Sequence, residues 1–329
     1  MHVETPLAIE ASGLAKAFGD TKAVDGVDLA VRSGTVYGVL GPNGAGKTTT
    51  VRMLTTMSQP TSGTGRVAGH DNKEPDAVRR SMGLTGQAAT VDELLTGREN
   101  IRLIGRFAGL SGKEVRRIGD ELLERFSLTD AADRVAKTYS GGMRRRLDLA
   151  VSLVATPPVL FLDEPTTGLD PRSRTDLWEV LRGLVRDGTT LLLTTQYLEE
   201  ADQLADNIVV IDRGHIIAEG TPTQLKDQAG RASVVVTVTN GSDLRAAEGV
   251  VRQFTEDVNV DEGGKRLAVR ASGLQDMLAI GDAISRAGIP VDDLGLQRPS
   301  LDDVFLHLTG HRAEDVADDE SLELEEAVR

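Results

Sequence analysis

The segment Gly41-Pro42-Asn43-Gly44-Ala45-Gly46-Lys47-Thr48 constrains the fold more than any other part of the chain. It fits the pattern G-x-x-x-x-G-K-[ST]. It lies between a short β-rich run at residues 36–40 and residues 47–57, whose apolar side chains recur at helical spacing. Glycines in such a loop let backbone N–H groups and the helix N-terminus face phosphate oxygens. The sequence therefore predicts a strand, a phosphate-binding loop (Walker A) and a helix, in that order.

The loop also carries its own charge and metal chemistry. Lys47 is expected to neutralise the β and γ phosphate oxygens, and the Thr48 hydroxyl to ligate Mg²⁺. A glycine-rich turn without a ligand is the alternative, but the strand-to-helix context argues against it. The predicted nucleotide-binding residues of the loop are Gly41, Pro42, Asn43, Gly44, Ala45, Gly46, Lys47, Thr48 and Thr49.

A second motif puts two acids at the end of an apolar strand. Residues 159–162 are continuously apolar, and Asp163 and Glu164 follow directly. At the carboxyl edge of a parallel sheet both carboxylates would lie beside the phosphate loop. We expect Asp163 to hold Mg²⁺ through water, and Glu164 to orient or deprotonate the attacking water, with Lys47 assisting catalysis. The alternative is a pair of acids that only face solvent.

Further runs indicate the fold class. Residues 159–162, 190–195 and 208–211 are separated by helix-like segments such as 174–186, as in parallel strands buried on both faces. In Val27–Arg32 the large apolar residues instead fall on every second position, the period of a strand with one buried face. The expected fold is α/β, with a mainly parallel sheet around the phosphate loop.

The pattern changes in the last third of the chain. A helix is expected to begin at Pro222 and to end near Gly230. Beyond it, residues 233–239 alternate as a strand and residues 274–287 are helical, which suggests a small α+β unit of βαββαβ type, as in ferredoxin-like folds. We therefore expect three parts, at residues 5–230, 231–310 and an acidic, disordered tail at 311–329.

Composition excludes several classes of function. The absence of cysteine rules out disulfides, cysteine-ligated zinc and thiol catalysis, and suits the cytoplasm. A net charge of −14 without a basic stripe argues against nucleic acid as a partner. The longest apolar run, residues 151–162, is too short to span a bilayer, and the N-terminal residues do not have the pattern of a secretory signal. We expect a cytoplasmic protein that does not itself cross a membrane.

The motif that decides among phosphate-loop families is Tyr139-Ser140-Gly141-Gly142-Met143. It resembles the signature motif of ABC ATPases, commonly LSGGQ, and precedes the second carboxylate motif as in that family. Gln87 resembles the glutamine of the Q-loop, Gly168-Leu169-Asp170 the D-loop, and Phe18 the aromatic that stacks on adenine. The resemblance covers about residues 5–230. It implies a P-loop ATPase core with an N-terminal antiparallel β part and a helical subdomain.

The resemblance also implies partners. In ABC ATPases the signature of one subunit completes the ATP site of the other, so the chain is expected to form a homodimer on binding ATP and Mg²⁺. Ser140, Gly141 and Gly142 would then bind the γ-phosphate held by the partner, and Gln87 would be a further Mg²⁺ ligand. Phe18 as a core aromatic, Gln87 as a surface loop residue and Asp170 as a helix cap remain alternatives. Arg144, Arg145 and Arg146 are expected to be structural or interfacial.

One position departs from the family pattern. After Thr194-Thr195, where most members have a histidine at the γ-phosphate, this chain has Gln196. An amide can donate a hydrogen bond but cannot take up a proton near neutral pH. We expect Gln196 to act in catalysis with slower turnover and preserved binding. The next histidine, His215, is expected to lie in another hairpin.

The segments 194–202, 139–146 and 84–87 resemble the daunorubicin-resistance group of ABC exporters, and residues 299–306 resemble its accessory C-terminal domain. The resemblance implies an antibiotic-resistance ATPase on the inner face of the cell membrane, driving efflux of a drug-like or amphipathic compound through a separate transmembrane permease. A soluble ABC ATPase of repair or translation is disfavoured because the chain has one cassette and no internal repeat. A nucleotide-gated regulatory or binding module with weak hydrolysis is the other alternative; Gln196 favours it and Glu164 opposes it.

Overall fold

The computed structural model divides into two compact units, which meet in sequence between Pro222 and Thr223. The division lies earlier than the boundary expected near residue 231, because periodicity in the sequence marks where the second unit's sheet begins and not its first helix. The residues that the structure describes are 6–86, 90–228, 230, 232–255, 257–261, 263, 265–271 and 273–309. Gln87 and the acidic tail at 311–329 lie outside them.

An antiparallel sheet forms the N-terminal part of the first unit, in the order β2-β1-β4-β5. Its members are β1 (Leu7–Phe18), β2 (Thr21–Arg32), β4 (Ser62–Val67) and β5 (His70–Asp71). In β2 the side chains of Val27, Leu29 and Val31 are buried and those between them are exposed, as the alternating sequence predicts. This confirms the antiparallel β part.

The central sheet has the order β10-β9-β3-β8-β7-β6. All neighbours in it are parallel except β9 and β10, which form an antiparallel hairpin. The strands are β3 (Val36–Leu40), β6 (Met82–Thr85), β7 (Val159–Asp163), β8 (Thr190–Thr195), β9 (Asn207–Asp212) and β10 (His215–Gly220). Every residue of β3, β7 and β8 is buried, because helices or the other sheet cover both faces. The mainly parallel sheet is confirmed.

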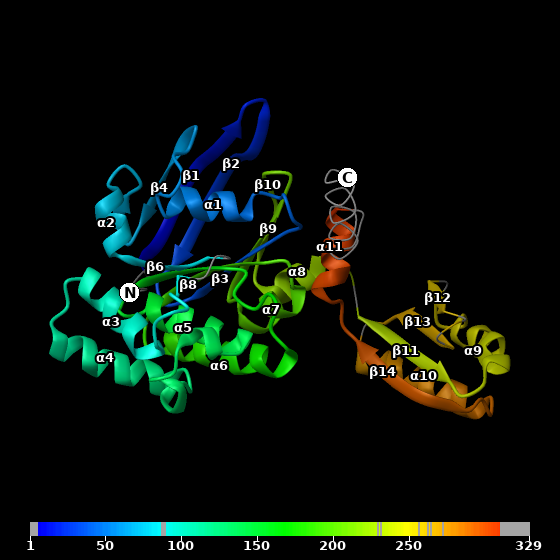
Figure 1. Ribbon diagram of the computed structural model, residues 1–329. Helices are drawn as coiled ribbons and strands as arrows, with labels where there is room; N and C mark the ends of the chain where they lie inside the picture. The colour runs from blue at the N-terminus through cyan, green and yellow to red at the C-terminus, as the bar shows by residue number, and fades with distance from the viewer. Residues whose placement is uncertain are drawn as a thin grey trace, which may run out of the picture. The chain divides into compact units, whose positions relative to one another are not determined.

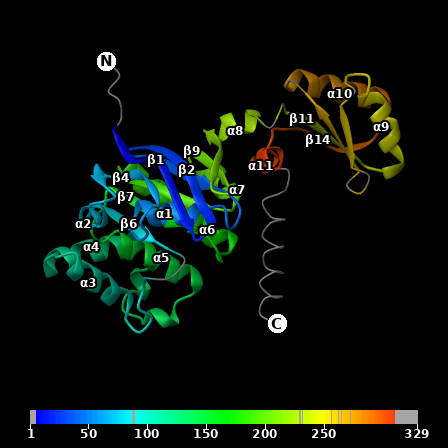
Figure 2. The same cartoon turned by 90° about the horizontal axis from the view of Figure 1, so that it is seen from above.

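Helices cover this sheet and join it to the antiparallel sheet (Figures 1 and 2). Helix α1 contacts β1, β2 and β4 on one side and β7 on the other, so it lies between the two sheets. It ends earlier than expected, at Leu54, and Thr56 adopts a left-handed φ of 60° just beyond it. The helices are α1 (Lys47–Leu54), α2 (Pro75–Arg80), α6 (Pro171–Arg186) and α7 (Leu198–Leu204).

Three further helices pack on one another and form the expected helical subdomain: α3 (Gly97–Phe107), α4 (Gly112–Arg125) and α5 (Gly141–Ser152). Short 3-10 turns, η1 (Thr129–Ala131) and η2 (Ala136–Thr138), connect α4 to α5. Helices α3 and α4 each begin with a capping box, in which Thr96 pairs with Glu99 and Ser111 with Glu114. Helix α5 also contacts β6, so it links the subdomain to the central sheet.

The second unit begins around α8 (Pro222–Gln228) and has the predicted βαββαβ order. Its elements are β11 (Ser233–Val238), η3 (Gly241–Asp243), α9 (Leu244–Val251), β12 (Val258–Asp261), β13 (Arg266–Arg270), α10 (Leu274–Arg286), β14 (Val291–Gln297) and α11 (Leu301–Thr309). The antiparallel sheet order β12-β13-β11-β14 is ferredoxin-like. Val234, Val236 and Val238 face α9 and α10 in an apolar core. Across the residues that the structure describes, no helix has the length and apolarity needed to cross a bilayer.

Candidate nucleotide-binding and hydrolysis site

The phosphate loop joins β3 to α1 with a backbone that requires glycine. Gly44 and Gly46 have φ values of 72° and 106°, in the left-handed region. A Cβ atom at Gly46 would lie 2.5 Å from the carbonyl oxygen of Ala23, and one at Gly41 would lie 2.2 Å from that of Ile211. The turn therefore depends on close backbone approach at two points, as a loop that wraps phosphates must.

Lys47 is the first residue of α1, and its side chain is only 5% exposed. Its ammonium donates hydrogen bonds to the carbonyl oxygens of Gly41 at 2.8 Å and Pro42 at 2.9 Å. It also lies 4.0 Å from a carboxylate oxygen of Glu164. The ammonium thus lies over the loop beside an acid at the end of β7, a position from which it can reach phosphate oxygens.

Two of the three expected metal ligands, Thr48 and Asp163, lie together at the carboxyl edge of the central sheet. The Thr48 hydroxyl donates to Oδ1 of Asp163 at 3.1 Å, and the Thr194 hydroxyl of β8 donates to the same oxygen at 2.5 Å. A hydroxyl and a carboxylate are the hard oxygen donors that Mg²⁺ prefers. Thr48 and Asp163 therefore fit a magnesium ion, and Thr194, which the sequence did not single out, orients the carboxylate.

Glu164 turns away from the strand direction that Asp163 follows. Its φ of 50° is left-handed for a residue with a side chain, a strain on the order of 1 kcal/mol. Its N–H bonds the carbonyl and the hydroxyl of Thr194 at 3.1 and 3.2 Å, and its carboxylate accepts from the Thr167 hydroxyl at 3.2 Å. These contacts hold the backbone and the buried carboxylate of Glu164, whereas the carboxylate of Asp163 accepts from Thr48 and Thr194.

The signature residues open the long helix α5. Ser140 is the N-cap and accepts a hydrogen bond from the N–H of Met143 at 3.2 Å. Ser140 and Gly141 are exposed, and a Cβ at Gly141 would meet no atom within 4 Å. Gly142 is half-buried, and a Cβ there would lie 3.1 Å from the Ser173 hydroxyl at the start of α6. The helix N-terminus is thus open to an anion.

The lesser motifs have different outcomes. Phe18 ends β1 with its side chain 58% exposed, so it is not a core aromatic, and the Lys16 ammonium lies 5.1 Å from its ring centroid. Asp170 caps α6, accepting from the N–H of Ser173 at 2.9 Å and from its hydroxyl at 2.6 Å. These hydrogen bonds lower the pKa of Asp170. The cap that was an alternative for Asp170 is therefore present.

Gln196 follows β8, next to the strand that carries Asp163, and is half-buried. The neighbouring Tyr197 donates its N–H to the Thr195 hydroxyl at 2.9 Å, and its ring lies 5.0 Å from the Arg174 guanidinium of α6. His215 lies in the β9–β10 hairpin, as expected, with its Nε2 3.8 Å from an Asp25 carboxylate oxygen.

Two buried ionic residues had no catalytic or nucleotide-binding role in the sequence interpretation, where Arg145 was expected to be structural or interfacial and Glu200 had no role. Arg145 of α5 donates to the backbone carbonyls that surround Glu164, whereas its neighbours Arg144 and Arg146 make other contacts. Glu200 of α7 is fully buried. Burial raises the pKa of Glu200, and the nearby polar groups of Thr195, Thr166 and Trp178 offset this only in part. No local pattern distinguishes these residues, because their contacts come from distant segments.

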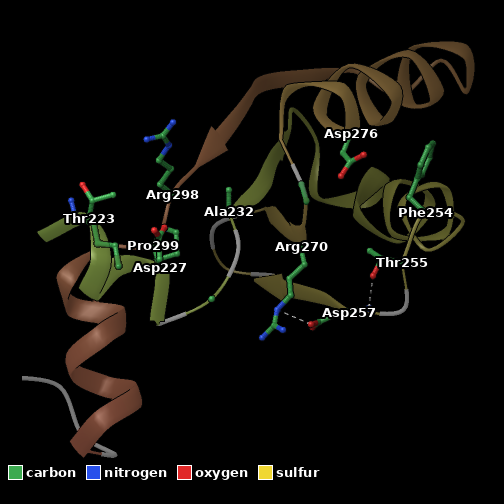
Figure 3. A pocket seen from close by; sticks show the side chains of 13 residues that line it. Thr223, Asp227, Ala232, Phe254, Thr255, Asp257, Arg270, Asp276, Arg298 and Pro299 are labelled. Carbon is green, nitrogen blue, oxygen red and sulfur yellow. Dashed lines mark hydrogen bonds and ion pairs between the residues drawn. The ribbon is translucent and has the colours of Figure 1, made fainter. Parts of the chain in front are cut away.

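A cavity of about 1060 Å³ lies elsewhere, in the second unit (Figure 3). Its wall includes the Arg270–Asp257 ion pair at 2.9 Å, Phe254, which follows α9, and Asp276 of α10. The lining mixes both charges and includes none of the phosphate-loop, carboxylate or signature residues. The size of a cavity therefore does not locate the chemistry of this chain.

Comparison with known families matches both units. Residues 24–167 match the family described as ABC transporter. Residues 220–309 match the family described as ATP-binding protein DrrA1-3-like, C-terminal domain. The second match begins close to the division between the two compact units.

Relatives that match nearly the whole chain are ATP-binding proteins too. The chain is 51% identical to the daunorubicin/doxorubicin resistance ATP-binding protein DrrA of Streptomyces peucetius, over 99% of each chain. It is 45% identical to the doxorubicin resistance ATP-binding protein DrrA of Mycobacterium tuberculosis, over 92% of this chain and 94% of the relative. It is 40% identical to the Nod factor export ATP-binding protein I of Ralstonia nicotianae, over 94% and 96%.

Solved structures share the fold. The ATP-binding subunit of an ABC transporter superposes with a TM-score of 0.62 at 28% identity, covering 68% of this chain and 93% of that one. A dimeric ATP-binding cassette in a post-hydrolysis state, with ADP and phosphate bound, gives 0.59 at 25% identity, covering 65% and 98%. With its phosphate loop, carboxylates and signature helix in this fold, and with relatives along nearly its whole length, the chain belongs to the ATP-binding proteins of ABC transporters.

Proposed function

We propose that this chain hydrolyses ATP to ADP and phosphate and thereby powers efflux of a drug-like or amphipathic compound through a separate membrane subunit. The observation that carries the proposal is the cluster of Lys47, Thr48, Asp163 and Glu164 at one edge of the central sheet. The relatives named for daunorubicin, doxorubicin and Nod factor export support the transport role and the amphipathic class of cargo.

Binding rests on the loop. Lys47 exchanges its carbonyl partners for β and γ phosphate oxygens, and the backbone N–H groups of Gly44 to Thr49 face the phosphates. Thr48 and Asp163 hold Mg²⁺, with Gln87 as a further ligand. When bound, Mg²⁺ neutralises phosphate charge. The exposed ring of Phe18 stacks on adenine, and Lys16 lies beside it.

Hydrolysis rests on Glu164. Its carboxylate accepts a proton from the water that attacks the γ-phosphorus, while the bond from that phosphorus to the β-phosphate oxygen breaks and ADP leaves. Thr167 and the backbone contacts to Thr194 hold the carboxylate in position for this step. Gln196 donates a hydrogen bond to the γ-phosphate without taking up a proton.

The signature residues act on a second copy. Ser140 and Gly141 are exposed at the N-terminus of α5, so they can bind the γ-phosphate held by another chain. Binding of ATP therefore favours a head-to-tail homodimer, and hydrolysis weakens it. A solved ATP-binding cassette of the same fold is dimeric with ADP and phosphate bound, which supports the formation of a dimer.

The permease contact uses the helical subdomain. Leu94, Leu103 and Phe107 expose 77%, 38% and 79% of their side chains on or next to α3. Exposed large apolar residues in one segment are typical of protein contact surfaces. This segment follows Gln87 in sequence, which would let nucleotide binding press on the membrane subunit from the inner face of the membrane.

The decisive experiment compares wild type with Glu164→Gln. We expect the substitution to lower the rate of ATP hydrolysis by about a hundredfold or more and to leave MgATP affinity within about threefold. Light scattering should then show a stable ATP-bound dimer of the variant. Equal hydrolysis rates in the two proteins would overturn the role of Glu164.

Gln196 favours the second candidate, a nucleotide-gated module with weak hydrolysis. Gln196→His should raise the rate of hydrolysis by about tenfold if the missing imidazole limits turnover. ATP affinity should not change, because the amide already bonds the phosphate. An unchanged rate would remove Gln196 as the cause of slow turnover.

A further inference from the structure

Arg145 lies in α5, between the signature motif and the catalytic edge of the sheet. Its guanidinium donates to four backbone carbonyls: those of Gly86 and Pro165 at 2.8 Å, Glu164 at 2.9 Å and Asp163 at 3.1 Å. The side chain is 13% exposed. The fixed fork of a guanidinium can bind several acceptors in one geometry, which a lysine cannot.

Asp148, one turn later on α5, binds a second backbone segment. Its Oδ1 accepts the N–H of Thr90 at 2.7 Å, and its Oδ2 lies 3.7 Å from Nη1 of Arg145. The carboxylate side chain is 2% exposed. Gly86 and Thr90 flank Gln87 in the chain, so the two members of this pair bind the backbone on both sides of that residue.

Arg145 and Asp148 orient nearby backbone segments, and their ion pair is not expected to stabilise the fold. Burial lowers the pKa of Arg145 and raises that of Asp148, while the attraction between them acts against both shifts. A buried ion pair is weak evidence for stability, because its desolvation can exceed the attraction. The hydrogen bonds that join the pair to Gly86, Thr90 and residues 163–165 all go to backbone that carries or flanks catalytic groups.

The neighbouring arginines provide the contrast. Arg144 is 40% exposed and lies 3.7 Å from Glu93. Arg146 donates to the carbonyl of Phe126 at 3.3 Å, inside the helical subdomain. The three consecutive arginines therefore point to different partners, and it is Arg145 that contacts the end of the carboxylate strand.

We propose that Arg145 and Asp148 are a positioning pair that ties the signature helix to the catalytic carboxylate of the same chain and to the backbone at Gly86 and Thr90. The proposal rests on the proposed ATPase function. A shift of α5, when its N-terminus binds the nucleotide of a second copy, moves the carbonyls on either side of the Glu164 Cα. Each site thus sets the geometry of the other, and neither residue itself touches phosphate or metal.

The test measures kcat and KM of ATP hydrolysis for Arg145→Gln, Arg145→Lys and Asp148→Asn. Arg146→Lys is the matched control on the same helix. We expect Arg145→Gln to lower kcat by about ten- to a hundredfold while the Kd for MgATP stays within about twofold. Arg145→Lys should recover part of the rate, and Arg146→Lys should leave it unchanged. The Arg145→Gln, Asp148→Asn double variant should lose less than the product of the single losses.

A second readout does not depend on turnover. Amide hydrogen exchange at Thr90 should accelerate in Asp148→Ala, which removes the oxygen that accepts the Thr90 N–H. The change in exchange that a non-hydrolysable ATP analogue causes at the amides of Asp163 and Glu164 should disappear in Arg145→Gln. Unchanged kcat with unchanged exchange would overturn the pairing, as would a loss of ATP affinity in step with a fall in melting temperature. Wild type that binds ATP without hydrolysing it would count against the proposed function alone, and the exchange data would still decide the coupling.

Discussion

The two units of this chain bury different kinds of side chain. Among the residues that the structure describes, the buried polar and charged side chains all lie between Lys47 and Glu200, in the first unit. The core of the second unit, under α9 and α10, is apolar, and its ion pairs Arg286–Asp282 and Arg270–Asp257 are exposed. Buried polar groups carry a desolvation cost unless they are well partnered. The first unit carries that cost, in part at Lys47, Asp163 and Glu164, whereas the core of the second unit is apolar.

The largest expected effect is a loss of stability in the second unit that leaves ATP binding by the first unit unchanged. Leu267 on β13 is fully buried in the apolar core of the second unit. Leu267→Ala removes that packing and should lower the free energy of unfolding of the second unit by about 2–5 kcal/mol. Because the phosphate loop and the carboxylates belong to the first unit, MgATP affinity should not change. Chemical denaturation and a nucleotide-binding titration on the same variant check both statements.

A loss of ATP affinity in Leu267→Ala would break the comparison, because it would mean that the two units fold as one. Leu278→Ala on α10 is the matched control, since its side chain is 60% exposed. That variant should change the free energy of unfolding by less than about 0.5 kcal/mol.

The next effect concerns two glycines with opposite surroundings. A Cβ at Gly41 of the phosphate loop would lie 2.2 Å from a backbone carbonyl oxygen, which cannot move aside cheaply. Gly41→Ala should therefore destabilise the first unit by about 1–3 kcal/mol and weaken ATP binding. Gly249 in α9 has no atom within 4 Å of its Cβ position. Gly249→Ala should stabilise its helix by about 0.5–1 kcal/mol.

Thermal melting of both glycine variants, with and without MgATP, measures these shifts. A Gly41→Ala protein that binds ATP as tightly as wild type would show that the loop relaxes around the added methyl group. The melting temperature should fall in Gly41→Ala and rise in Gly249→Ala, and the comparison requires these opposite signs.

The sequence predicted the parts of the site that lie in short contiguous motifs. Lys47 and Thr48 were expected beside Asp163 and Glu164, and the structure brings them together because strand, loop and helix follow one another directly. The alternation of residues 233–239 likewise predicted a strand of the second unit. Local periodicity and glycine chemistry were sufficient for these features.

Other features depend on packing between distant segments. Nothing near Arg145 in sequence indicates that it reaches Gly86 while Arg144 and Arg146 do not. The orientation of Asp163 by the Thr194 hydroxyl needs the register of β7 against β8, which a single sequence does not fix. The same limit applies to Glu200, whose burial comes from the packing of α7.

The last prediction concerns Glu200, whose effect on the free energy of unfolding depends on pH. Burial raises the pKa of its carboxyl above the ordinary 4.5. The folded state therefore binds this proton more tightly than the unfolded state does. The resulting stabilisation is complete below about pH 4.5 and is lost as pH rises through the folded pKa. Glu200→Gln removes the ionisable group while keeping its shape and one side-chain oxygen that can accept a hydrogen bond.

We expect the free energy of unfolding of Glu200→Gln to exceed that of wild type at pH 8 by on the order of 1 kcal/mol. The difference should shrink as the pH falls toward 4.5. Urea unfolding at both pH values measures it. Glu199→Gln is the matched control, because that carboxylate is 69% exposed and lies 3.7 Å from Arg174. Its effect should stay within about 0.5 kcal/mol at both pH values. A Glu200→Gln protein less stable than wild type at pH 8 would show that the charge of the buried carboxylate is fully compensated in the folded state. The desolvation cost that distinguishes the first unit from the second would then not include Glu200.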